Sequence, residues 1–216
     1  VGGTSGSLRE STTFDLAQDA LAGVKFLRQR PEIDPRRVGI LGHSEGGIIA
    51  PLAASQTEDV AFIIMLAGSG VPGREILPRQ MELLMRAAGV PEEQIAAVLA
   101  SEGRVLDAIV AGADSSAIRA AMRDLLRAQL ASEAGGQAPD EKMLADQADA
   151  ALVQMTSPWF RSFLTLDPRP ALRRVKVPAL VLAGDLDLQV DPGQNLPEIE
   201  AALKADPLLV NALDRS

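Results

Sequence analysis

The most constraining feature of the sequence is a glycine-rich pentapeptide that separates a short apolar run from a helical segment. Residues 37–41 (Arg-Val-Gly-Ile-Leu) are typical of a buried parallel strand. The pentapeptide at 42–46 follows directly, residues 48–54 have the composition of a helix, and residues 60–66 form a second apolar run. A strand, a helix and a strand in this order predict a βαβ unit, and therefore a parallel sheet.

The pentapeptide itself carries a chemical signal, because Gly42-His43-Ser44-Glu45-Gly46 fits the pattern G-x-S-x-G. Between a strand and a helix, this pattern predicts a strained turn that exposes the serine Oγ. Gly42 and Gly46 leave room for neighbouring backbone to approach, and Gly47 adds further clearance. The start of the following helix directs N–H groups and a positive dipole end toward a developing oxyanion. We therefore predict that Ser44 is a nucleophile.

A second signal follows a later apolar run at 179–183, which predicts another strand and leads into Gly184-Asp185-Leu186-Asp187. An acid just past the carboxyl end of a later strand is where the orienting member of a Ser–acid–His triad belongs. Asp187 is the favoured candidate and Asp185 the second. Both are also common residues in ordinary turns, so a purely structural role stays open.

Residues 75–163 differ from the rest in composition and in apolar periodicity. They are rich in Ala, Leu, Arg and Glu, and their apolar residues recur at helical spacing throughout. We predict four or five helices and no strand. This stretch is either a separate packing unit or a lid; its position between two strands of an open α/β sheet favours the lid, since ligands bind at that rim. Near its end, Trp159 and Phe160 are candidates for lining an acyl pocket, with plain core as the alternative.

The remaining elements are expected at the two ends of the chain. Apolar spacing, a threonine cap at Thr12 or Thr13 and a following proline predict a helix over 13–29. Residues 196–204 predict a helix, and 208–213 a last strand.

Composition excludes several classes of function. The chain has 216 residues and a net charge of −8, with 21 Lys and Arg against 29 Asp and Glu. This balance, without a basic cluster, argues against nucleic-acid binding. No apolar run reaches the roughly 18–20 residues of a membrane span. The absence of cysteine excludes disulfides and thiolate chemistry, and a single histidine excludes any mechanism that needs two within these residues.

The sequence resembles the bacterial α/β-hydrolases with a Gly-His-Ser-Glu-Gly-Gly elbow, the serine aminopeptidase-like and lysophospholipase-like group. The resemblance is carried by Thr12-Thr13, Asp15, Asp19, Ala50-Pro51 and residues 33–40, 42–47, 66–68, 157–160 and 184–190. It implies Ser44 as the nucleophile, Asp187 as the triad acid and the backbone N–H of Glu45 as one oxyanion donor.

The resemblance also implies the architecture: the C-terminal part of an α/β-hydrolase fold. We expect a parallel sheet of about four strands, with an all-helical cap inserted between the family's sixth and seventh strands. Residues 1–74 would form a partial core with the elbow, 75–163 the cap, and 164–216 the resumed core with the triad acid.

The sequence departs from the family's pattern at two parts of the active site, the catalytic histidine and the second oxyanion donor. The family's catalytic histidine follows the last strand, and a loop before the point equivalent to Val1 supplies a second oxyanion donor. His43 is a poor substitute, because the residue before the nucleophile points its side chain away from the serine Oγ. We expect the chain to be a piece of a longer protein. The strand at 37–41 would then be an apolar sheet edge through which the segment associates with itself.

These observations predict a serine hydrolase, most simply a carboxylic ester hydrolase that works through an acyl-enzyme on Ser44. Its partner would be a small apolar ester, with no cofactor and no metal, and the 216 residues alone would have no meaningful turnover. A serine aminopeptidase of the same fold and a non-catalytic scaffold or binding module are the alternatives. The sequence indicates no cellular compartment.

Overall fold

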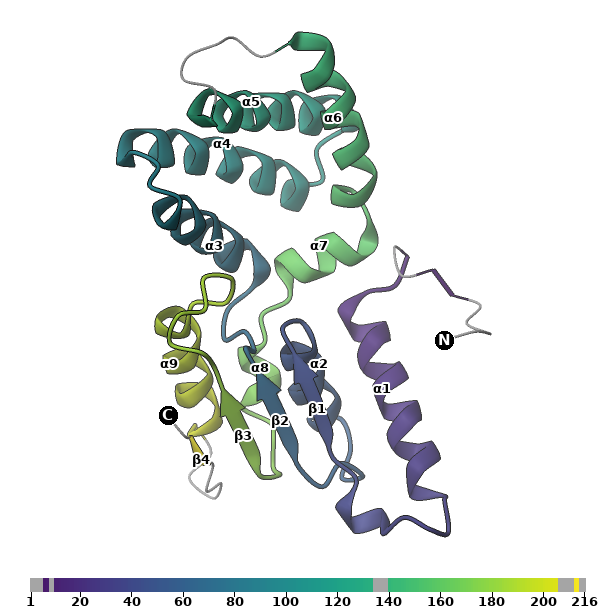
Figure 1. Ribbon diagram of the computed structural model, residues 1–216. Coiled ribbons are helices and arrows are strands. Elements are labelled where there is room, and N and C mark those ends of the chain that lie inside the picture. The colour runs from purple at the N-terminus through teal and green to yellow at the C-terminus, as the bar shows by residue number, and fades with distance from the viewer. Residues whose placement is uncertain (1–5, 8–9, 134–139, 206–211, 214–216) are drawn as a thin grey trace. The chain divides into compact units, whose positions relative to one another are not determined.

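The computed structural model describes residues 6–7, 10–133, 140–205 and 212–213 (Figure 1). The chain divides into compact units of different character. We call Gly73–Thr165 the helical unit, and Ser11–Pro72 together with Leu166–Ser216 the sheet unit.

The sheet unit contains a parallel sheet in the order β1-β2-β3-β4. Its strands are β1 (Ile40–His43), β2 (Ile63–Leu66), β3 (Ala179–Leu182) and β4 (Ala212–Leu213). The predicted α/β class with a parallel sheet of about four strands is confirmed. Of the predicted last strand, residues 208–211 lie outside the described residues.

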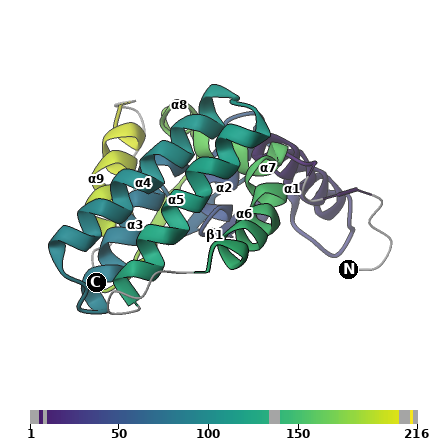
Figure 2. The same cartoon turned by 90° about the horizontal axis from the view of Figure 1, so that it is seen from above.

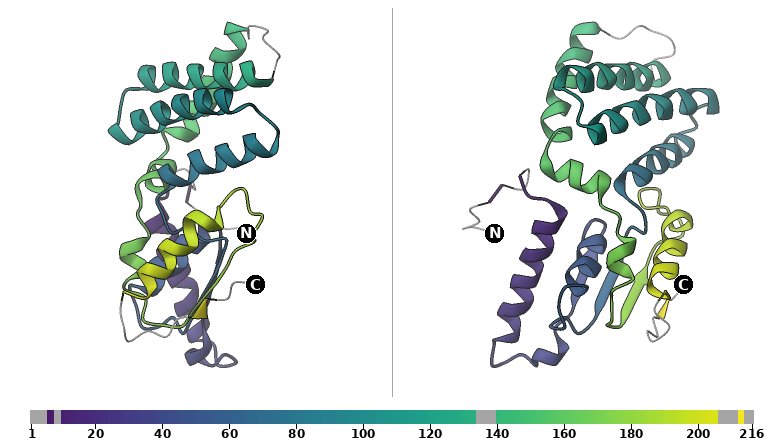
Figure 3. Two further views of the ribbon diagram at one scale, coloured as in Figure 1. Left: turned by 90° about the vertical axis from the view of Figure 1, so that its left-hand side faces the viewer. Right: turned by 180° about the vertical axis from the view of Figure 1, so that it is seen from behind.

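Helices α2 (Gly46–Ala54), α8 (Arg169–Leu172) and α9 (Pro192–Leu203) pack against one face of this sheet. Helix α1 (Thr13–Arg28) packs mainly against α2. In Figure 1, α2 lies behind the strands, and in the rear view of Figure 3 it lies in front of them. On the covered face, Ile63, Met65 and Val181 are buried in one core with residues of α2 and α9. Burial of this apolar surface supplies most of the stabilisation of such a unit.

Side chains on the opposite face of the sheet are more exposed to solvent, and those of β1 are the most exposed. Among the described residues, β1 pairs only with β2, and the side chain of Leu41 is 60% exposed. Leu66 and Leu182, which point to the same side of their strands, are half-buried. Self-association through this edge stays a prediction.

Local capping explains where the element boundaries differ from the prediction. Pro35–Arg37 forms a 3₁₀ turn capped by Asp34, whose side chain accepts from the N–H of Arg36, so β1 begins three residues later than expected. Helix α9 begins four residues earlier than expected, because Asp191 caps it through the N–H of Gly193 and Pro192 occupies the first turn. The short helix α8 has no counterpart in the prediction.

The helical unit is built from α3 to α7, and its described residues contain no strand, as expected. The bounds are Gly73–Ala87, Glu92–Ala111, Ser115–Glu133, Glu141–Met155 and Pro158–Thr165. Figure 2 shows α3, α4 and α5 running side by side, and these neighbours pack through a shared apolar core. None of the described helices combines the length and apolar character needed to cross a membrane.

The apolar seam of α4 contains one acid. Ile95, Val98, Val105 and Ile109 are buried with the alternating three- and four-residue spacing of a packed helix, and Glu102 occupies the position between Val98 and Val105. Glu102 is only 7% exposed, and its Oε2 has no hydrogen-bond partner among the described residues. Burial raises the pKa of this carboxyl to about 7.

Candidate active site

Ser44 lies on a sharp turn between β1 and α2. Its φ is +55°, in the left-handed region that residues with a Cβ rarely adopt, and the residue is exposed. Its backbone N–H donates to the carbonyl oxygen of Leu66 at 3.0 Å, which anchors the turn to the end of β2. This is the strained strand–turn–helix geometry predicted from the G-x-S-x-G pattern.

Close backbone contacts leave no room for side chains around this turn. A Cβ on Gly42 would lie 1.9 Å from the carbonyl oxygen of Gly46, and one on Gly47 would lie 2.5 Å from the Cα of Gly68. A Cβ on Gly46 would meet nothing within 4 Å among the described residues. The predicted close approach is therefore correct at Gly42 and at Gly47, which meets the neighbouring loop, and wrong at Gly46.

Asp187 lies in the loop that follows β3, and backbone groups hold its carboxylate. Oδ1 accepts the N–H of Gln189 at 2.8 Å and the N–H of Val190 at 3.0 Å. The N–H of Asp187 itself donates to the carbonyl oxygen of Gly184 at 3.1 Å. Asp187 is half-buried, whereas Asp185 is exposed, and Oδ2 of Asp187 has no hydrogen bond among the described residues. One oxygen is thus held in place and the other is left to accept a further donor.

Strand register brings these two residues to the same edge of the sheet. His43, Leu66 and Leu182 are aligned across β1, β2 and β3, so Ser44 and the Asp187 loop both follow the carboxyl ends of strands. They leave the sheet two strands apart, which corresponds to about 10 Å at the usual spacing of neighbouring strands. In open parallel sheets this edge is where ligands bind.

The residue after Ser44 is held from a different element. Glu45 directly precedes α2, and its Oε1 accepts a hydrogen bond from the hydroxyl of Thr13 at 3.0 Å. Thr13 is completely buried at the start of α1. The predicted oxyanion donor, the backbone N–H of Glu45, therefore belongs to a residue that is fixed through its side chain.

The sequence as a whole matches a known family over almost its entire length. The profile of the alpha/beta hydrolase family covers residues 3–213. The chain belongs to the alpha/beta hydrolase family. No curated protein matches it.

Several solved structures are similar to this chain at low sequence identity. A hydrolase from Pseudomonas aeruginosa is 19% identical over 100% of this chain and 68% of its own, with a TM-score of 0.47. An alpha/beta fold family hydrolase from Bacillus anthracis is 18% identical over 98% of this chain and 68% of its own, with a TM-score of 0.48. Acylaminoacyl peptidase from Pyrococcus horikoshii is 18% identical over 97% of this chain and 24% of its own, with a TM-score of 0.45. The chain thus spans about a quarter of that peptidase.

The single histidine of the chain is the last residue of β1. His43 is exposed, it directly precedes Ser44, and it makes no hydrogen bond to any described residue. The histidine base that a serine nucleophile needs is therefore not brought to Ser44 by this strand.

The two aromatic pocket candidates lie in the helical unit, on α7. Phe160 is buried in the apolar core of that unit, whereas Trp159 is half-buried. Both contact Phe163, and the rings of Trp159 and Phe163 are stacked with centroids 6.1 Å apart. Their role in an acyl pocket stays a prediction, with Trp159 the more accessible of the two.

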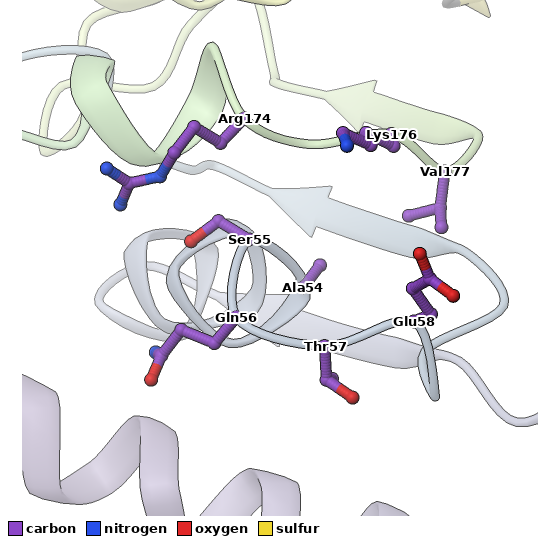
Figure 4. A pocket seen from close by; sticks show the side chains of 8 residues that line it. All are labelled: Ala54, Ser55, Gln56, Thr57, Glu58, Arg174, Lys176 and Val177. Atoms are coloured by element: carbon purple, nitrogen blue, oxygen red, sulfur yellow. The ribbon is translucent and has the colours of Figure 1, made fainter.

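A cavity of about 440 Å³ in the sheet unit lies away from the serine. It is lined by the residues that end α2 and by Arg174, Lys176 and Val177, whereas Ser44 precedes the opposite end of α2. Figure 4 shows the side chains of Arg174 and Thr57 pointing in different directions rather than toward a common centre. Nor do the described residues include a group of three or more His, Asp or Glu side chains placed to hold a metal ion.

Sequence reasoning missed one buried polar residue at this edge, because no motif marks it. Asn195 on α9 is 1% exposed; its Oδ1 accepts the N–H of Gly70 at 2.9 Å, and its Nδ2 donates to the carbonyl oxygen of Asp191. It therefore joins the loop after β2 to the segment that follows Asp187. Ala67 in the same loop also has a positive φ of +45°, so this loop, like the serine turn, is a strained backbone held by its surroundings.

Proposed function

We propose that this hydrolase cleaves a carboxylic ester through an acyl-enzyme on Ser44. The observation that carries the proposal is the strained, exposed conformation of Ser44 between β1 and α2, with a φ of +55°. Asp187 supports the proposal, because it lies at the same edge of the sheet and backbone N–H groups hold its Oδ1. Its Oδ2 accepts no hydrogen bond from a described residue and can therefore accept one from a histidine.

In this proposal, the Oγ of Ser44 attacks the ester carbonyl while a histidine removes its proton. The N–H of Glu45 donates to the oxyanion of the tetrahedral intermediate, and the histidine then protonates the leaving alcohol. Asp187 orients the histidine and stabilises its charged form. Water releases the acid from Ser44 in the second half of the reaction. The histidine comes from outside these 216 residues, since His43 is the only one they contain.

The apolar helical unit supports a small or medium apolar ester as the substrate. Its helices bury aliphatic and aromatic side chains in one core, and we propose that the unit acts as a lid with Trp159 at the acyl chain. A peptidase that takes an N-terminal residue remains the alternative within the family. It would need carboxylates that hold the substrate amine, and no such pattern is evident in the acids of this unit.

The test uses a protein that carries these residues together with its catalytic histidine. Such a protein should hydrolyse p-nitrophenyl butyrate, and Ser44→Ala or Asp187→Asn should lower kcat by about 10⁴-fold or more. The 216-residue chain alone should show no turnover above its own Ser44→Ala variant. Hydrolysis that survives Ser44→Ala would overturn the proposal.

Two further measurements separate the alternatives. Covalent labelling of Ser44 by a fluorophosphonate probe, read by mass spectrometry, is expected for the hydrolase and not for a scaffold. Preference for alanine p-nitroanilide over the butyrate ester would replace the esterase with the aminopeptidase.

A further inference from the structure

Thr13 and the serine turn are 31 residues or more apart in sequence, yet one hydrogen bond joins them directly. The hydroxyl of Thr13 donates to Oε1 of Glu45 at 3.0 Å. Thr13 is 0% exposed, so no water competes for this hydroxyl. Its position is fixed by the capping box at the start of α1, in which Thr12 and Asp15 bond each other's backbone N–H groups.

Glu45 uses its carboxylate in an unusual way for a residue at the start of a helix. It occupies the cap position of α2, but its side chain makes no capping hydrogen bond to that helix. The carboxylate is bound by the hydroxyl on α1 instead. Its backbone is helical, with φ −55° and ψ −32°, directly after the strained Ser44.

We propose that Thr13 is a positioning residue for the oxyanion donor of this hydrolase. By holding the carboxylate of Glu45 on α1, it fixes the direction of the Glu45 backbone N–H and keeps the negative charge away from the oxyanion. This inference rests on the proposed function, because it assigns Thr13 a role only through the nucleophile turn.

Two physical effects explain why fixing the side chain of Glu45 would favour catalysis. An oxyanion donor acts over a narrow range of about 2.7–3.1 Å, and small misplacements are costly in rate. A carboxylate on the residue next to the nucleophile also repels the developing negative charge, and this repulsion grows where water is excluded. A hydrogen bond from a buried hydroxyl would reduce both the misplacement and the repulsion, because it fixes the side chain of Glu45 and partly offsets its negative charge.

The support behind Thr13 is rigid. Helices α1 and α2 pack through a core that contains Ala17, Leu52 and Ala53. A second hydrogen bond joins α1 to the turn that follows α2, from Nε2 of Gln18 to Oε1 of Gln56 at 2.8 Å. This second bond lies at the end of α2 far from Ser44, so it provides a matched control.

The experiment compares Thr13→Val, Thr13→Ser and Gln18→Leu in the protein that carries the catalytic histidine. Thr13→Val keeps the shape of the side chain and removes the hydroxyl, so we expect kcat for p-nitrophenyl butyrate to fall about tenfold with KM within twofold of its original value. Thr13→Ser keeps the hydroxyl and should restore most of the lost kcat. Gln18→Leu removes the hydrogen bond from α1 to Gln56, which has a similar length, and should leave kcat unchanged.

A second comparison isolates the charge of Glu45. In a Glu45→Gln background the side chain still accepts a hydrogen bond but carries no charge, so Thr13→Val should lower kcat only about threefold there. An equal fall in both backgrounds would contradict the part assigned to the carboxylate charge.

The outcomes separate this inference from the proposed function. If Ser44→Ala abolishes turnover but Thr13→Val keeps kcat within twofold, only the positioning role is wrong. A fall in kcat as large in Gln18→Leu as in Thr13→Val, or no recovery in Thr13→Ser, would also overturn it. Turnover that does not depend on Ser44 would overturn the proposed function and this inference together.

Discussion

The sheet unit and the helical unit hold their conformations by different means. In the sheet unit, backbones meet where no side chain fits, as at Gly42 and Gly47, and two residues with a Cβ have positive φ. In the helical unit, regular helices pack through an apolar seam, and arginine–carboxylate pairs lie on the surface. The closest backbone contacts of the sheet unit gather at the serine turn, whereas the helical unit is held largely by side-chain packing, with one close backbone contact between Gly73 and Phe163.

The largest expected effect lies at the serine turn. In Gly42→Ala the new Cβ would lie 1.9 Å from the carbonyl oxygen of Gly46, so the turn must open. In the protein that carries the catalytic histidine, we expect a loss of more than 10³-fold in kcat for the proposed esterase reaction and of about 3 kcal/mol or more in stability. Both are measured by p-nitrophenyl butyrate assay and by urea unfolding.

Gly46→Ala is the matched control for this substitution. It adds the same methyl group four residues away, in the first turn of α2, where nothing lies within 4 Å. Its stability should change by less than about 1 kcal/mol. If the two variants behave alike, the contrast between crowded and open positions in this turn is wrong.

Asn195 tests whether the loops of the sheet unit depend on single hydrogen bonds. Asn195→Leu keeps the branched shape of the side chain but leaves the buried N–H of Gly70 without its acceptor at 2.9 Å. We expect a loss of about 2–3 kcal/mol in urea unfolding, because a buried donor then lacks a partner. The exposed neighbour Gln189, changed to Leu, should cost little. A loss within about 0.5 kcal/mol for Asn195→Leu would show that the loop finds another acceptor.

Glu102 is the exception within the helical unit, since it places an acid in an apolar seam. Burial raises its pKa to about 7 in the folded chain, against about 4.3 when unfolded. The contribution of the neutral form is complete below the unfolded pKa and is lost as the pH rises through 7. We expect the unfolding free energy to fall by about 1–3 kcal/mol between pH 5 and pH 8.

Glu102→Gln and Glu102→Leu identify the source of that pH dependence. Both should remove it, and Glu102→Leu should also raise the stability at pH 8, since Leu matches Val98 and Val105 on either side. The measurement is urea unfolding at several pH values. An unchanged pH profile in both variants would assign the dependence to other groups.

The sequence predicts well both the close backbone contacts of the serine turn and the helices of the helical unit, for different physical reasons. Ser44 and its strained turn follow from the G-x-S-x-G pattern, because steric limits on the backbone allow few residue types there. The five-helix unit follows from apolar periodicity, which specifies helices without specifying their partners. The start of α9 at Pro192 was harder to predict, because Asp191 reads equally well as a turn residue and as a helix cap.

Long-range polar contacts lie beyond this kind of prediction. The bonds from Thr13 to Glu45 and from Gly70 to Asn195 join residues 32 and 125 positions apart. Thr13 has a local signal as a candidate helix cap, but that signal does not identify Glu45 as its partner, and no motif marks Asn195. Only the fold shows which donor and acceptor it brings together.

The smallest expected effect tests the tolerance of the helical unit directly. Gly103 lies inside α4, and a Cβ there would meet nothing within 4 Å among the described residues. Gly103→Ala should raise stability by about 0.5–1 kcal/mol, because alanine loses less backbone entropy on folding and is the better helix former. Thermal and urea unfolding would detect the gain, with esterase kcat expected to stay the same. A loss of stability would mean that α4 is packed as tightly at Gly103 as the serine turn is at Gly42, and the contrast between the two units would then fail at the position where it should be clearest.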